Sequence, residues 1–248
     1  MSEEIECRLG RIEQMIRYAI WSSDRKGVVI GVSGGVDSAV CSALCCRAVG
    51  GERVLGLLMP SGVTAGEDMA DARQLCRSLG MKSRTVNIEP VLQAYREVPD
   101  FIEKPYLMGN LMARTRMALL YYFANKDDLL VCGTSNRTEY LLGYFTKYGD
   151  GAGDIEPILH LFKGEVYTMA RNLGIPDNIQ KKPPSAGLWK GQLDEEEIGL
   201  DYRTIDESLA RLELNGWKSS SPVDDQVLTM VRKSGHKRLP PPSLLRSD

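Results

Sequence analysis

One stretch of the chain combines glycine, hydroxyl and carboxylate residues at a spacing that suits phosphate chemistry. Its residues are Gly31, Val32, Ser33, Gly34, Gly35, Val36, Asp37 and Ser38. Apolar segments before it (28–30) and after it (39–49) predict the order strand, glycine-rich turn, helix. Such a turn directs free backbone N–H groups and the positive end of the helix dipole at one point, where phosphates bind. The glycines let the backbone approach phosphate oxygens closely.

The Asp37 carboxylate separates this stretch from the Walker phosphate loop, which has Lys followed by Ser or Thr. A carboxylate beside a phosphate is repulsive unless a divalent cation lies between them, and Mg²⁺ suits that position. Without the lysine that contacts the γ-phosphate, the loop favours chemistry other than γ-phosphoryl transfer. The alternative is a tight turn whose Asp37 caps the helix, which the complete Ser-Gly-Gly-Val-Asp-Ser string disfavours.

A second polar loop follows an apolar run at 129–132 and contains Thr134 and Glu139. If the strand at 129–132 neighbours the strand at 28–30, both loops flank one crevice, and Glu139 would complete the metal site begun by Asp37. Taken alone, Glu139 is an ordinary solvated helix acid. Lys163 stands at the start of a predicted helix, where a cation opposes the helix dipole. That local cost suits a lysine held for a ligand anion, although a wet surface also tolerates it.

Apolar periodicity predicts strands alternating with helices along the chain. Strands are predicted at 28–30, 54–59, 84–88 and 129–132, and helices at 5–21, 67–79, 90–97, 107–124, 161–173, 204–214 and 224–234. This alternation predicts an α/β fold, a doubly wound parallel sheet with helices on both faces. Ligands of such sheets bind at the carboxyl ends of the strands, where strand order reverses.

The composition is that of an ordinary globular protein. The 248 residues suffice for one sizeable core, so we predict a single domain over residues 1–248. A formal net charge of −2 gives no reason to expect a nucleic-acid partner. No apolar run approaches a membrane span, and Met1 leads straight into acidic residues rather than a secretory signal. We therefore expect a cytoplasmic protein without a membrane partner.

Two later loops and one helix carry further signals. The loop at 144–156 is rich in glycine and aspartate, which favours binding over a plain surface turn. The basic, proline-containing loop at 181–189 is either a mobile lid or a connector. The helix at 107–124 is apolar on most sides, which predicts burial or an interface with a second copy. Asn110 and Arg114 share one face of it, whereas Arg116 lies roughly 200° further round.

Six segments, in this order, resemble ammonia-dependent NAD synthetases, a family of the ATP pyrophosphatase superfamily. They are Gly-Val-Ser-Gly-Gly-Val-Asp-Ser (31–38), Gly-Asn-x-x-Ala-Arg-x-Arg-Met (109–117), Gly-Thr-x-x-x-x-Glu (133–139), Gly-Tyr-Phe-Thr-Lys-Tyr-Gly-Asp-Gly (143–151), Lys-x-Pro-Ser-Ala-Gly-Leu-Trp (182–189) and His-Lys-Arg (236–238). The first is shared with other pyrophosphatases, whereas the string containing Phe-Thr-Lys-Tyr is much more specific. The resemblance implies an adenine nucleotide alpha hydrolase-like fold and a homodimer.

The resemblance also implies an activity. It is the ATP-dependent amidation of deamido-NAD (nicotinic acid adenine dinucleotide) to NAD with ammonia, the last step of NAD biosynthesis. The reaction would pass through an adenylated carboxylate and release AMP and pyrophosphate.

Roles of individual residues follow from the same resemblance. ATP would contact residues 31–38, Thr134, Lys163 and Ser185, of which Asp37, Lys163 and Ser185 would be catalytic. Deamido-NAD would contact Arg114, Lys147, Asp154, His236 and Lys237. Mg²⁺ would bind Asp37 and Glu139. Ser185 stands where the family has threonine, which keeps a hydroxyl, and Val36 stands where bacterial relatives often have glutamine.

Two other readings stay open at this point. One is another adenylating amidotransferase or a tRNA-thiolating enzyme of the same superfamily, although no catalytic cysteine pair or basic face is visible. The other is a non-catalytic nucleotide-binding module, which would not need Asp37, Glu139 and Lys163 together. Pyrophosphate release on adding deamido-NAD and ATP would separate all three.

Overall fold

Four parallel strands form the centre of the molecule. The structure, a computed structural model, describes residues 3–244. The strands are β1 (Gly27–Gly31), β2 (Val54–Leu58), β3 (Lys82–Thr85) and β4 (Leu129–Cys132). Their order in the sheet is β3-β2-β1-β4, with Val29 paired to Leu55 on one side and to Val131 on the other. Strand order therefore reverses between β1 and β4, and the predicted neighbourhood of these two strands is confirmed.

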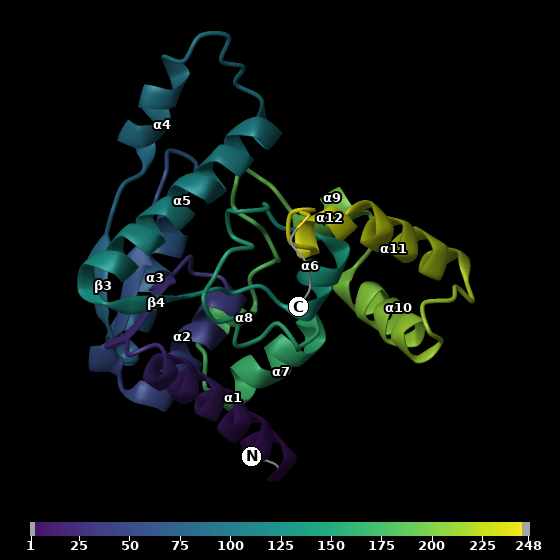
Figure 1. Cartoon of the computed structure of the whole chain (residues 1–248), viewed down its shortest axis with the longest axis horizontal. Helices are drawn as coiled ribbons and strands as arrows, with labels where there is room; N and C mark the ends of the chain where they lie inside the picture. Colours follow the sequence, from purple (N-terminus) through teal and green to yellow (C-terminus); the bar gives the residue numbers. More distant parts are fainter. Residues whose placement is uncertain (1–2, 245–248) are drawn as a thin grey trace.

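Helices cover both faces of this sheet (Figure 1). One core cluster joins β1 residues such as Val28 and Ile30 to α1 (Glu3–Ser22), α2 (Val36–Val49), α3 (Gly66–Ser78) and α7 (Lys163–Asn172). The other joins Val29 and Val131 to α4 (Glu89–Arg96) and α5 (Pro105–Asp127). Successive residues of β1 thus point to opposite cores, as a strand buried on both faces requires. The doubly wound α/β fold is confirmed.

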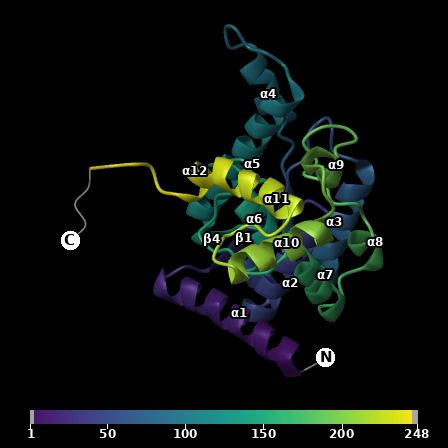
Figure 2. The same cartoon turned by 90° about the vertical axis from the view of Figure 1, so that its right-hand side faces the viewer.

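The C-terminal part of the chain builds a small helical layer beside the sheet (Figure 2). Its helices are α6 (Arg137–Leu142), α9 (Asp194–Ile198), α10 (Tyr202–Leu214), α11 (Pro222–Lys233) and α12 (Gly235–Arg238). Two short elements lie outside this layer: α8 (Asp177–Gln180) contacts α2, and a 3₁₀ turn, η1 (Gly51–Arg53), precedes β2. Ile205, Leu209 and Val227 are fully buried in this layer. Since α10 packs on both α6 and α7, the layer holds the first turns of those two helices in place. The single domain over 1–248 stays a prediction.

The third strand differs from its predicted range of 84–88. The strand β3 covers residues 82–85, and its side chains are all exposed. It forms at the sheet edge by pairing with β2, so its side chains need not be apolar. Ile88, which drew the prediction further along the chain, is buried in the core beyond the strand. Within residues 3–244, no helix is long and apolar enough to cross a membrane.

Candidate functional site

The glycine-rich stretch forms the predicted turn between β1 and α2. Gly34 has φ +85°, and a Cβ there would lie 2.6 Å from the Asp68 carbonyl oxygen, so only glycine fits. The Ser33 and Ser38 hydroxyl oxygens are 3.0 Å apart, and the Gly35 N–H donates to Ser33 Oγ at 3.2 Å. These bonds hold the turn open at the N-terminus of α2, where phosphate oxygens meet free N–H groups.

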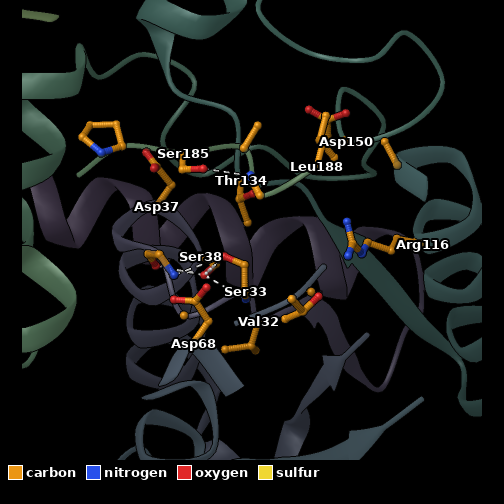
Figure 3. A pocket seen from close by; sticks show the side chains of 18 of the residues that line it. Val32, Ser33, Asp37, Ser38, Asp68, Arg116, Thr134, Asp150, Ser185 and Leu188 are labelled. Atoms are coloured by element: carbon orange, nitrogen blue, oxygen red, sulfur yellow. Dashed lines mark hydrogen bonds between the residues drawn. The ribbon is translucent and has the colours of Figure 1, made fainter. Parts of the chain in front are cut away.

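A cavity of about 480 Å³ lies above this turn, at the carboxyl ends of β1 and β4. It is lined by every residue predicted to contact ATP, namely residues 31–38, Thr134, Lys163 and Ser185, and by Glu139. Figure 3 shows Ser33 and Ser38 below the cavity, with Asp37, Thr134 and Ser185 around it. The fold thus brings together residues that lie up to 154 positions apart in the chain.

Lys163 joins the two predicted metal ligands. Its Nζ lies 2.7 Å from Asp37 Oδ2 and 3.1 Å from Glu139 Oε1, and the residue is 2% exposed. Asp37 Oδ1 also accepts from Asn136 Nδ2 at 2.9 Å. The three charged side chains stand in the first turns of α2, α6 and α7. Burial alone would lower the pKa of the Lys163 ammonium, but the two carboxylates raise it above its ordinary value.

The positions of Asp37 and Glu139 are compatible with a shared Mg²⁺ ion. Asp37 and Glu139 converge on one ammonium group, so both carboxylates reach the same small volume. Burial raises the pKa of the Glu139 carboxyl, a cost that a bound cation would offset. No group of three or more His, Cys, Asp or Glu residues within the described chain is arranged to hold a metal. Mg²⁺ is usually bound by one or two carboxylates, with phosphate oxygens and water as its other ligands. Asp37 and Glu139 therefore fit the ion.

Four of the five residues predicted to contact deamido-NAD lie side by side outside the cavity lining. Arg114 Nε donates to the Lys147 carbonyl oxygen at 3.2 Å, and Lys147 Nζ donates to the His236 carbonyl oxygen at 2.7 Å. Lys237 follows His236 and donates to two carbonyl oxygens of the loop before Lys147. Asp154 is set apart from this basic cluster, because its carboxylate accepts from the Val131 N–H at 2.8 Å.

A sequence model of the family described as NAD synthase matches residues 8–241. The chain belongs to the NAD synthase family. It is 56% identical over 245 residues to the NH(3)-dependent NAD(+) synthetase of Methanoregula boonei, and the match covers 99% of both chains. The resemblance drawn from the six sequence segments is therefore confirmed.

Two solved structures are similar to this NAD synthase family member over nearly its whole length. The NMN synthetase of Francisella tularensis has a TM-score of 0.88 and 34% identity, and the match covers 98% of each chain. The NH3-dependent NAD synthetase of Campylobacter jejuni has a TM-score of 0.84 and 33% identity, and the match covers 99% of this chain and 100% of that one. The predicted adenine nucleotide alpha hydrolase-like fold is confirmed by this likeness.

The loop predicted as a lid lies across the cavity in this family member. Lys182 binds two carboxylates of α3, Asp68 at 2.6 Å and Asp71 at 2.5 Å. At the other side of the loop, the Ala186 N–H donates to Asp194 Oδ1 at 2.9 Å. Ser185, between these two attachments, lines the cavity. The opening and closing of this loop stays a prediction.

Three residues that line the cavity were not among the predicted site residues. Asp194 is 3% exposed and accepts from the Tyr144 and Tyr202 hydroxyls as well as from the lid backbone. In the sequence it belongs to an acidic run that indicates a solvated segment. Arg116 and Asp150 line the cavity, and they lie in segments 109–117 and 143–151, which resemble the family. Their position in these family-like segments is the only signal in the sequence that could have predicted a role for Arg116 and Asp150.

Proposed function

We propose that this chain is an ATP-dependent ligase that amidates deamido-NAD to NAD with ammonia, completing NAD biosynthesis. The observation that carries the proposal is the contact of Lys163 with both Asp37 and Glu139 beside the phosphate loop. A module that only bound a nucleotide would gain nothing from a buried cation shared by two carboxylates, because burying such charges is costly. The name of the relative at 56% identity supports the same activity.

The chemistry requires two transfers. An oxygen of the nicotinate carboxylate attacks the α-phosphorus of ATP, the bond to the β-phosphate breaks, and pyrophosphate leaves. Ammonia then attacks the acyl carbon of the adenylate, the bond from that carbon to the AMP oxygen breaks, and the nitrogen loses a proton. No protein nucleophile is needed, so the chain must align the two anionic substrates and stabilise the charge on the leaving groups.

The residues of the cavity divide these tasks. The N–H groups of residues 31–38 and the Lys163 ammonium would hold the leaving pyrophosphate. Bound magnesium, held by Asp37 and Glu139, would supply Lewis-acid neutralisation of the phosphate charge. The lid over the cavity would keep water from the adenylate, so that ammonia and not water reaches the acyl carbon. Asp194 would hold the lid backbone in its place beside Ser185.

The homodimer is part of this proposal. Tyr106, Leu107 and Tyr122 on α5 are 66%, 40% and 60% exposed, although the opposite side of the helix packs on the sheet. In both views, α4 and the segment that joins it to α5 project from the body of the molecule (Figure 1 and Figure 2). That segment exposes Val98 and Ile102. A second copy across α5 would cover these apolar groups and bring deamido-NAD to the shared surface.

Two measurements test the dimer. Light scattering at micromolar concentration should give twice the chain mass, and a monomeric mass would reject the assembly. Mixing inactive Asp37→Asn with inactive Arg114→Ala, followed by subunit exchange, should restore part of the activity if one site draws on both chains. A dimer without such complementation would place Asp37 and Arg114 of each site in one chain.

The activity itself is tested with purified chain, ATP, Mg²⁺ and an ammonium salt. Deamido-NAD should yield NAD, AMP and pyrophosphate in equal amounts. Replacing deamido-NAD by nicotinate mononucleotide addresses the similarity to an NMN synthetase, and a faster reaction with the mononucleotide would overturn the dinucleotide assignment. Glutamine in place of ammonium should give a negligible rate, and glutamate formed in step with NAD would refute the ammonia requirement. Fractionation of the source cells would test the predicted cytoplasmic location.

A further inference from the structure

A partly buried guanidinium in the cavity wall has no carboxylate partner. Arg116 lies on α5, and Figure 3 shows its side chain pointing into the cavity. Its Nε donates to the Met59 carbonyl oxygen at 3.1 Å, and it forms no ion pair with a carboxylate among the described residues. Burial lowers the pKa of this guanidinium, and the charge of Asp150 offsets only part of that effect. A cation in such a place is costly unless an anion joins it.

The other cations of the cavity lining do not share this property. Lys163 and Lys182 each bind two carboxylates, and Lys190 is exposed to solvent. Among the lining residues of the described chain, Arg116 is therefore the partly buried cation that has no carboxylate partner and can pair with an anionic ligand. Its planar fork of donors matches the oxygens of a phosphate or a carboxylate.

The position of Arg116 in the cavity indicates which phosphate or carboxylate of the substrates it could bind. Ala113, Met117 and Leu120 of the same helix also line the cavity, and Leu120 follows Arg116 by one helical turn. A Cβ at Gly31, the first residue of the phosphate loop, would touch Leu120 Cδ1 at 3.8 Å. The same Cβ would lie 3.5 Å from Met59 Cε, and Arg116 is hydrogen-bonded to the Met59 carbonyl oxygen, so Arg116 lies near the first residue of the loop. Lys163 instead contacts Asp37, near the end of the loop in the first turn of α2.

We infer that Arg116 binds the α-phosphate of ATP and of the adenylate made from it. This inference rests on the proposed function. The N–H groups at the N-terminus of α2 already offer a site for the pyrophosphate. The substrate carboxylate loses its charge when it is adenylated, whereas the α-phosphate stays anionic in ATP, in the adenylate and in AMP. The α-phosphate can therefore stay paired with the Arg116 guanidinium in every state of the reaction. Its negative charge increases when AMP leaves the acyl carbon, which strengthens this pair.

Adenosine and AMP differ only by this phosphate, so a pair of dissociation constants tests the contact directly. We would titrate both ligands into the wild-type protein, Arg116→Gln and Arg116→Lys by calorimetry. Arg116→Gln should weaken AMP on the order of 10- to 100-fold while changing adenosine less than about threefold. Arg116→Lys, which keeps the charge and loses the fork, should lie between wild type and Arg116→Gln. Retained adenosine affinity shows that the cavity of each variant is folded.

Arg114→Gln is the matched change, two residues away on the same helix but outside the cavity. It should raise KM for deamido-NAD without changing the ratio of the AMP and adenosine constants. An equal loss of AMP and adenosine in Arg116→Gln would overturn the inference in favour of a contact with the base or ribose. Unchanged AMP affinity with a raised KM for deamido-NAD would overturn it in favour of the carboxylate. If wild-type protein bound neither ATP nor AMP, the proposed function itself would fail.

Discussion

The carboxyl group of Glu156, beside the cavity residue Gly133, gives a measurable test of how burial affects charge next to the site. Its Oε2 is buried without a hydrogen-bond partner among the described residues. The carboxylate fills the space beside Gly133, where a Cβ would lie 2.0 Å from Oε1. Burial raises the pKa of Glu156 from its ordinary value of 4.5 to about 7. Ionising this side chain in the folded protein is therefore unfavourable, and we expect Glu156→Gln to remove that cost.

The sign of the effect follows from proton binding. Between pH 4.5 and about 7 the folded chain holds a proton on Glu156 that the unfolded chain has released. The free energy of unfolding contributed by this group therefore falls as pH rises through this window. The whole shift corresponds to about 3 kcal/mol above pH 7, as an upper value for a partly exposed side chain. Glutamine resembles the protonated form, so Glu156→Gln should be about 1 to 3 kcal/mol more stable than wild type at pH 8.

Urea unfolding of the nucleotide-free protein at pH 5, 6, 7 and 8 gives the needed free energies. The difference between Glu156→Gln and wild type should be within about 0.5 kcal/mol at pH 5 and should grow with pH. Glu196→Gln, at an exposed position of α9, is the matched control and should show a difference that does not depend on pH. A constant difference for Glu156→Gln, or a loss of stability at pH 8, would refute a carboxyl whose ionisation is opposed by burial.

Three further predictions concern the charged cavity. Asp37→Asn and Glu139→Gln should each lower kcat at saturating Mg²⁺ by about a hundredfold or more with the circular dichroism spectrum unchanged, and near-normal turnover would reject the two-carboxylate site. Lys163→Met leaves two carboxylates without their cation and should cost about 3 kcal/mol of unfolding free energy in urea at pH 8, so an unchanged midpoint would contradict the buried ion pairs. Protease cleavage within 181–189 should be suppressed by ATP and deamido-NAD together, and equal cleavage with and without them would count against a lid.

The sheet could be predicted because three of its four strands are apolar on both faces. Residues 28–30, 54–58 and 129–132 are nearly all buried, so their composition marks them directly. The edge strand β3 has the sequence Lys-Ser-Arg-Thr and no buried side chain. Its existence depends on the free edge of β2, which composition does not reveal. The helix at 107–124 was predicted with both ends inside its observed range of 105–127.

The site was predictable to the extent that its parts are local. The phosphate loop is one continuous turn, so its chemistry can be read from consecutive residues. Glu139 required the further inference that β4 neighbours β1, and the observed strand order supports that inference. Asp194, which lines the cavity, and Glu156, which lies beside it, could not be found in this way. Asp194 takes its role from contacts with Tyr144 and Ala186, and Glu156 from its burial beside Gly133, and neither leaves a local pattern.

The placement of Lys163 explains how the site can hold so much charge of one sign before any nucleotide binds. Asp37 and Glu139 stand in the first turns of α2 and α6, where the positive ends of the helix dipoles favour a carboxylate. Lys163, in the first turn of α7, is unfavourable to its own helix but lies between the two acids and over the ring of Tyr202 at 4.9 Å. Residues of α2, α6 and α10 thus offset the unfavourable interaction of the Lys163 ammonium with the dipole of α7. The lysine that appeared misplaced in the sequence is the residue that allows the two carboxylates to approach each other.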